Sequence, residues 1–137
     1  MKKLICIVLA AALLFTLAAC GESATAPVKV DLGKSDRYTQ EDLQKAEKLV
    51  EDTIKGFTEA TIDLKSLTYA GDEKSMAELE YVNSLDRGAF DEVAIFGSLF
   101  HTSKDAGGAW EADTDYTWDF YLARSTGGEW TMVTYGY

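Results

Sequence analysis

The side chains best suited to chemistry in this 137-residue sequence are aromatic rings gathered near its carboxyl end. Aromatic rings with a few polar groups at the mouth of a cleft are typical of a small-molecule pocket. The predicted pocket combines Tyr69, Trp118, Phe120, Arg124 and Trp130, with the Arg124 guanidinium placed to bind a carboxylate ligand. The alternative is that the rings fill the core of a small sheet and that Arg124 pairs with an internal acid.

The only histidine, His101, is a second candidate for chemistry. A general acid or base needs a hydrogen-bonded partner and a nearby pocket. The alternative is a half-buried histidine at the end of a strand, with no chemical role. With no second histidine and no thiol in the folded part, only carboxylates remain as metal ligands, so a histidine-based zinc site is ruled out.

The acids Asp113, Asp115 and Asp119 are spaced like the start of a calcium-binding loop. An EF-hand loop requires a further acid where this chain has Thr117 and a glycine where it has Trp118, so the EF-hand is excluded. A different calcium site and a set of solvated acids stay open as alternatives. No glycine-rich phosphate loop and no serine–histidine–acid context is present, and we predict no bound metal, no cofactor and no catalytic residues.

The amino terminus carries the clearest motif. Lys2 and Lys3 precede sixteen uncharged residues, 4–19, which are too few to span a bilayer and are typical of a secretory signal peptide. The stretch ends in Leu-Ala-Ala-Cys followed by glycine, which resembles the bacterial lipobox. That resemblance implies that a diacylglyceryl group is attached to Cys20, which becomes the first mature residue and anchors the chain in the lipid bilayer. An ordinary secreted protein is the alternative.

This interpretation accounts for both cysteines and changes the charge. Cys6 lies in the discarded signal peptide and Cys20 is the lipid site, so the folded domain has no disulfide and no reactive thiol. The whole chain has a formal charge of -10; removing 1–19 takes away two lysines and no acid, leaving -12. An acidic surface repels nucleic acid, so we predict no nucleic-acid partner.

Residues 20–37 follow the signal peptide and are predicted to be a lipidated cysteine with a flexible tether. Residues 21–37 are small and polar, lack periodicity and contain the only proline, Pro27. Seventeen residues span at most roughly 60 Å when fully extended. The single folded domain is then expected over 38–137, at the outer face of the membrane.

The first element of this domain is predicted to be an amphipathic helix over about 39–58. Thr39 is a suitable N-cap with Asp42 three residues later, and apolar residues from Leu43 to Phe57 recur at helical spacing. Alternation predicts a strand over 62–69. Residues 72–88 are ambiguous between a short helix and a loop.

The carboxyl half is predicted to be a run of three strands. Residues 92–102 are apolar on both faces, which is typical of a central strand. A polar loop over 103–115 leads to an alternating strand over 116–123, and Thr126-Gly127-Gly128 is a hairpin turn before the last strand.

The segments DEVAIFGSLFHTS, YTWDFYLAR, GGEW and the terminal TYGY resemble a family of small lipoproteins of Gram-positive bacteria. The resemblance covers about 38–137 and implies a nuclear transport factor 2-like (cystatin-like) domain without an assigned function. With the element order, it predicts an α+β fold in which a long N-terminal helix packs on a curved antiparallel sheet of about four strands.

These observations predict a membrane-anchored extracytoplasmic lipoprotein that binds an unknown small ligand or protein. The alternative is a small-molecule isomerase or dehydratase with a pocket under the helix, for which Asp119, Tyr121 and His101 are the available groups. A partner-protein dock on an exposed sheet face is a third hypothesis.

Overall fold

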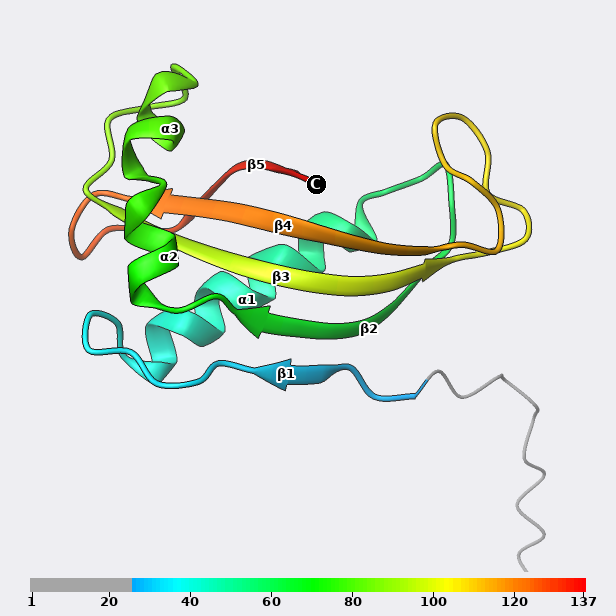
Figure 1. Cartoon of the computed structure of the whole chain (residues 1–137), viewed down its shortest axis with the longest axis horizontal. Helices are drawn as coiled ribbons and strands as arrows, with labels where there is room; N and C mark the ends of the chain where they lie inside the picture. The colour runs from blue at the N-terminus through cyan, green and yellow to red at the C-terminus, as the bar shows by residue number, and fades with distance from the viewer. Residues whose placement is uncertain (1–25) are drawn as a thin grey trace, which may run out of the picture.

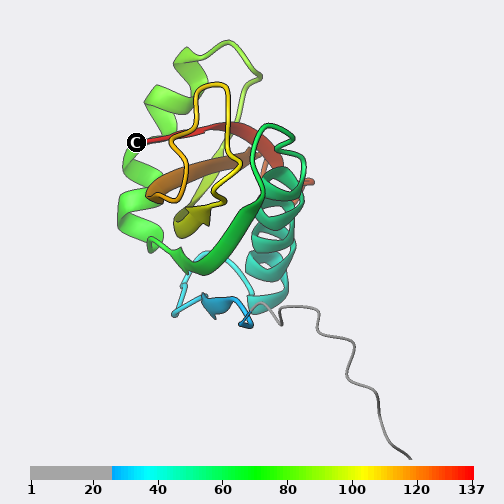
Figure 2. The ribbon, with the colours of Figure 1, turned by 90° about the vertical axis from the view of Figure 1, so that its right-hand side faces the viewer.

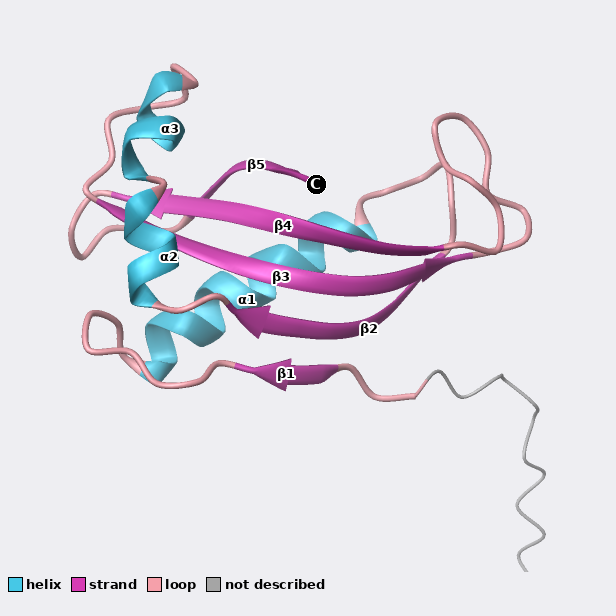
Figure 3. Ribbon diagram, viewed as in Figure 1, coloured by secondary structure: helices cyan, strands magenta, loops and turns pink. Residues whose placement is uncertain are grey.

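The computed structural model describes residues 26–137, which form one sheet with helices on both of its faces (Figures 1 and 3). The strand order in the sheet is β1-β2-β3-β4-β5. β1 pairs in parallel with β2, and every other neighbouring pair is antiparallel. The elements are, in chain order, β1 (Lys29–Asp31), α1 (Gln40–Lys55), β2 (Ile62–Tyr69), α2 (Asp72–Ala77), α3 (Leu79–Ser84), β3 (Glu92–Thr102), β4 (Asp115–Arg124) and β5 (Thr131–Gly136).

The predicted fold class was wrong. A long N-terminal helix on an antiparallel sheet of about four strands, of the nuclear transport factor 2-like type, was expected. The sheet instead has five strands and is mixed, and the first element of the described residues is strand β1. The helix α1 follows β1 and has 16 residues. A three-residue edge strand has no alternation of buried and exposed residues, and all three residues of β1 are exposed, so the sequence pattern gave no sign of it.

The same strand corrects the predicted tether. Residues 20–37 were expected to be flexible, but Lys29, Val30 and Asp31 lie in register with Ser66, Leu67 and Thr68 of β2. Backbone hydrogen bonds therefore hold part of this segment at the edge of the sheet. The signal peptide and Cys20 lie outside the described residues.

Helix α1 begins as its sequence predicts. The Thr39 side chain accepts a hydrogen bond from the Asp42 backbone N–H at 3.1 Å, and the Asp42 carboxylate accepts one from the Thr39 N–H at 3.3 Å. This capping box satisfies two of the backbone donors that a helix start leaves free. The helix ends before Gly56, three residues earlier than its apolar periodicity suggested.

Two hydrophobic clusters lie on opposite faces of the sheet because successive strand residues point to opposite sides. On the α1 side, Leu43 and Val50 pack on Phe96 and Phe120, all with no exposed surface. On the other side, α2 and α3 cross one end of β3 and β4 (Figure 1), and Val82 packs on Val93, Ile95 and Ala123. Strand β3 is thus buried on both faces at the centre of the sheet, which confirms the prediction for 92–102.

The strands predicted over 62–69 and 92–102 are found within the same bounds, and the ambiguous segment 72–88 contains the two short helices α2 and α3. Ser75 of α2 has no exposed surface, and its hydroxyl accepts a hydrogen bond from the Ile95 backbone N–H at 3.0 Å. This contact fixes α2 on the sheet.

Candidate functional site

Four of the five residues of the predicted pocket lie in the packed interior. Phe120 is fully buried, and Tyr69, Arg124 and Trp130 expose less than a tenth of their surface. Tyr69, Phe120 and Trp130 belong to the cluster under α1, where Tyr38 packs edge to face on Trp130 with ring centroids 5.3 Å apart. The space under the start of α1 is therefore filled by side chains.

Arg124 is held by acids of the protein itself. Its Nε donates to Glu92 Oε2 at 2.6 Å and its Nη1 donates to Asp42 Oδ1 at 3.0 Å. The guanidinium carbon lies 4.3 Å from the centre of the Trp130 ring, within the range of a cation–π contact. The hydrogen bond from Arg124 holds the pKa of Asp42 below its usual value. These contacts occupy the guanidinium, and Arg124 has a structural role.

Trp118 is the exception among the five predicted residues, because it lies at the far end of the α1 face, beyond the filled core. It lines a groove of about 910 Å³ that we call the aromatic groove. Six aromatic residues line it: Phe57, Trp110, Tyr116, Trp118, Tyr135 and Tyr137.

The rings of the aromatic groove come from four segments and contact one another. Trp118 stacks on Tyr135 with centroids 5.8 Å apart and lies 4.9 Å from Trp110. Phe57 lies 5.4 Å from Tyr135, and Tyr116 lies 5.3 Å from Trp110. Tyr135 is 43% exposed and Tyr137 89% exposed, so the groove offers ring surface to solvent.

Two loops lie at one end of the domain (Figure 2), and residues of both line the aromatic groove. The 56–61 loop follows α1, and the 103–114 loop joins β3 to β4. The Ser103 N–H donates to the Thr61 carbonyl at 3.0 Å, and the Gly107 N–H donates to the Glu59 carbonyl at 3.1 Å. The two loops are therefore fastened to each other.

Gly108 leaves room for the Glu59 carboxylate beside the 103–114 loop. Its φ of +65° lies in the left-handed region, and a Cβ there would lie 2.6 Å from Glu59 Oε2. A larger residue would push the Glu59 carboxylate away from the 103–114 loop.

The charged residues that line the aromatic groove are all acidic. They are the exposed residues Glu59, Glu111 and Asp115. No lysine or arginine lines the groove. Glu59 and Glu111 form no ion pair with any residue from 26 onward. The groove combines aromatic walls with unneutralised negative charge.

His101 is clamped beside the groove by two of the predicted calcium candidates. Its Nδ1 lies 2.7 Å from Asp115 Oδ1 and its Nε2 lies 3.0 Å from Asp113 Oδ1. The hydrogen bond to Asp115, followed by the one to Asp113, raises the pKa of His101 above 6.5. Two acceptors, one on each ring nitrogen, favour the doubly protonated imidazolium, which lacks the free nitrogen lone pair that a general base needs.

The three acids of the calcium hypothesis do not converge. Asp113 and Asp115 hold His101, whereas Asp119 accepts a hydrogen bond from Lys74 Nζ at 2.8 Å on the other face of the sheet. Within residues 26–137, no group of three or more histidine, cysteine or acidic side chains is placed to hold a metal ion.

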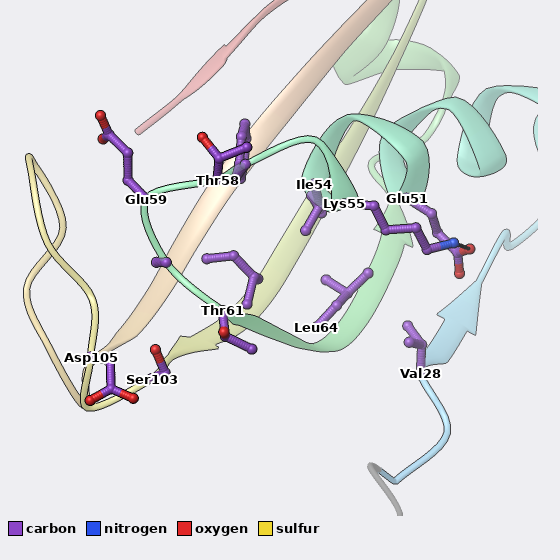
Figure 4. A pocket seen from close by; sticks show the side chains of 13 residues that line it. Val28, Glu51, Ile54, Lys55, Thr58, Glu59, Thr61, Leu64, Ser103 and Asp105 are labelled. Carbon is purple, nitrogen blue, oxygen red and sulfur yellow. Dashed lines mark hydrogen bonds and ion pairs between the residues drawn. The ribbon is translucent and has the colours of Figure 1, made fainter.

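A second cavity, of about 700 Å³, lies between the end of α1, the start of β2 and Val28 (Figure 4). Its walls include the apolar residues Ile54 and Leu64. Its charged pair, Lys55 and Glu51, is joined by a salt bridge of 3.1 Å. Glu59 and Asp105 also line this cavity, but Phe57 is its only aromatic lining residue. The aromatic groove, with six aromatic lining residues, is therefore the better candidate for ligand recognition.

The sequence showed part of the aromatic groove. Of the five residues predicted to form a pocket, only Trp118 lines the aromatic groove. The sequence prediction did not include Phe57, Glu59 or Glu111. Tyr116 and Trp118 share one face of β4 by simple alternation, which is a signal that could have been followed further. Phe57 and Glu59 reach the groove because the 56–61 loop packs on the 103–114 loop, and no local sequence pattern predicts that contact.

No protein-family model, curated protein sequence or solved structure matches this chain. The resemblance to small Gram-positive lipoproteins therefore stays a prediction. In residues 26–137, no helix is long and apolar enough to cross a membrane.

We predict that Arg124→Met destabilises the protein by about 3–5 kcal/mol, because it leaves Glu92 buried without its cationic partner. Lys74→Met removes a cation from an exposed pair and should cost at most about 1 kcal/mol. Urea unfolding followed by circular dichroism measures both. The double variant Arg124→Met with Glu92→Leu should recover part of the loss. A cost for Arg124→Met as small as that for Lys74→Met would contradict the assigned role.

We predict that the pKa of His101 lies above 6.5 and that Asp115→Asn lowers it. Because the folded-state pKa is raised, the stabilisation from this clamp is fully present below pH 6.5 and is lost as the pH rises through the folded-state value. The ring proton resonances of the only histidine report the pKa directly by NMR. Asp105→Asn removes an equal charge from the adjoining 103–114 loop and should leave the pKa unchanged. An equal response to both variants would refute the clamp.

Proposed function

We propose that this chain is a lipid-anchored extracytoplasmic binding module whose ligand occupies the aromatic groove. The observation that carries the proposal is the groove itself, which has six aromatic lining residues and a volume within the range of small-molecule sites. Two of its rings, Tyr135 and Tyr137, are exposed, and exposed aromatic clusters of this kind favour binding.

The lipobox-like end of the signal peptide supports the anchor. Two acyl chains on Cys20 are sufficient for stable membrane attachment, since each buried methylene contributes about 0.8 kcal/mol. The chain from Cys20 to Val28 spans at most about 30 Å in any conformation. The domain is thus held closer to the membrane than a seventeen-residue tether would allow.

The short connection also favours one orientation. Val28 lies against the end of α1 and the start of β2, where it lines the second cavity with Phe57 and Glu59. Phe57 and Glu59 also line the aromatic groove. The anchor therefore enters at the end of the domain that carries the groove, and that end is directed toward the membrane.

The enzymatic alternative has no observation in its favour. Asp119 is paired with Lys74, and His101 is clamped between two carboxylates. Tyr121 packs on Tyr81 of α3, with ring centroids 5.9 Å apart, on the sheet face opposite the aromatic groove. These groups do not share one pocket, and binding is the function we propose.

We predict that Cys20→Ala releases the protein from the membrane fraction and abolishes incorporation of labelled palmitate. Cys6→Ala is the matched control, because it removes the other cysteine from a part of the signal peptide that the cut discards. Membrane fractionation and labelling of cells that express each variant provide the measurement. Retention of the Cys20→Ala variant in the membrane would show that lipidation is not the anchor.

We predict that small ligands bind in a manner that depends on Tyr135. The probes are choline, its uncharged isostere 3,3-dimethylbutan-1-ol, the anion 3,3-dimethylbutanoate and methyl glucoside, each tested by saturation-transfer NMR on the full chain in phosphatidylglycerol nanodiscs. At least one probe should lose its signal with Tyr135→Ala. Tyr81→Ala is the control, because Tyr81 is 46% exposed on the other face. Absence of any Tyr135-dependent signal would overturn the proposed function.

A further inference from the structure

We infer that the ligand of the aromatic groove is an organic cation of the ammonium type. The inference rests on the proposed function and names the ligand class for the same site. Two properties of the lining carry it: its aromatic rings and its purely acidic charge.

The negative charge of the groove favours a positively charged ligand. Glu59, Glu111 and Asp115 line it without a basic residue. Asp115 is engaged by His101, whereas Glu59 and Glu111 make no ion pair within residues 26–137. A cleft lined by one sign of charge raises the local concentration of the opposite charge, and the formal charge of -10 on the whole chain adds to that field.

The rings set the kind of cation. The face of an aromatic ring attracts a cation within about 6 Å of its centre, and indole is the strongest of the side-chain rings. Trp110 and Trp118 lie 4.9 Å apart, with Tyr116 and Tyr137 close to Trp118 at 6.1 and 5.9 Å. A substituted ammonium presents both apolar methyl groups and a positive charge, and so uses rings and carboxylates together. An inorganic cation would be better served by oxygen ligands alone.

Other ligand classes use only part of this lining. An anion or a phosphate would be repelled by the unpaired carboxylates of Glu59 and Glu111, and no lysine or arginine lines the groove to attract it. An uncharged apolar molecule would use the rings but gain nothing from Glu59 and Glu111. The ammonium chemistry is shared by free small molecules and by membrane lipid headgroups, both of which are within reach of a domain held at the bilayer.

The test compares choline with its uncharged isostere on the full chain in phosphatidylglycerol nanodiscs. Choline should bind at least about tenfold more tightly than 3,3-dimethylbutan-1-ol, because only choline gains the cation–π and carboxylate attraction. The choline affinity should fall as sodium chloride is raised, whereas that of the isostere should not.

Matched double variants test whether the carboxylates of the groove, rather than the overall charge of the protein, attract choline. Glu59→Gln with Glu111→Gln should reduce the choline affinity by about tenfold, in line with the loss of two nearby charges. Glu73→Gln with Glu80→Gln changes the net charge equally at exposed positions of α2 and α3, and should leave the affinity within about twofold. An equal effect of both pairs would show that only the overall charge matters and would overturn the assignment.

Nanodiscs with half of their lipid replaced by phosphatidylcholine distinguish the source. The comparison is with nanodiscs diluted to the same surface charge by digalactosyldiacylglycerol, which has no ammonium group. A lower apparent affinity for free choline in the phosphatidylcholine nanodiscs indicates that the headgroup occupies the groove, and an equal affinity indicates a free cation. If the isostere or methyl glucoside binds as tightly as choline in a Tyr135-dependent manner, the cation class is overturned while the groove remains a binding site. If no probe shows Tyr135-dependent binding, the inference and the proposed function both fail.

Discussion

The buried ion pairs of Arg124 join three elements that are far apart in the sequence. Glu92 begins β3, Arg124 ends β4, and Asp42 lies in the first turn of α1. Asp42 also closes the capping box with Thr39, and its backbone carbonyl accepts the Trp130 Nε1–H at 3.0 Å. Asp42 thus acts through two groups: its carboxylate caps the helix and pairs with Arg124 of the sheet, and its backbone carbonyl holds Trp130 in the segment before β5. Because Arg124 and Glu92 are buried, removing one of them leaves the other without compensation.

Fixing the start of α1 determines where the helix ends. Leu43, Ala46, Val50 and Ile54 face the sheet along the whole helix, so its axis follows the buried row that begins beside Arg124. The end of α1 then delivers Phe57 and Glu59 to the far end of the sheet. There the 56–61 loop is fastened to the 103–114 loop by two backbone hydrogen bonds. A filled core at one end and an aromatic groove at the other are two consequences of the same helix placement.

The sequence predicted the elements with clear periodicity. Strands 62–69 and 92–102, the capping box at Thr39 and the loop before β4 follow from alternation, helical spacing and local hydrogen bonding. The number of strands and the parallel pairing of β1 could not be predicted from the sequence. The exposed edge strand β1 has no burial pattern, and its partner β2 lies more than thirty residues away. The pocket prediction placed Tyr69, Phe120 and Trp130 together, which the structure also does, but alternation cannot distinguish a ring that fills space from one that borders it.

The same limit explains why the carboxylates of the groove were missed. Glu59 and Glu111 stand in loops, where no period links them to Trp118, and only loop docking brings them to one rim. Once they are together, the electrostatics of the site and the geometry of the anchor support each other. With the proposed lipid anchor on Cys20, a connection of at most about 30 Å would keep the domain near the bilayer, and an acidic rim directed toward the lipids would disfavour anionic headgroups. Cations accumulate next to an anionic bilayer within about a Debye length. Under the proposed anchoring, a cation-binding groove would therefore face the layer of solution in which its ligand is most concentrated.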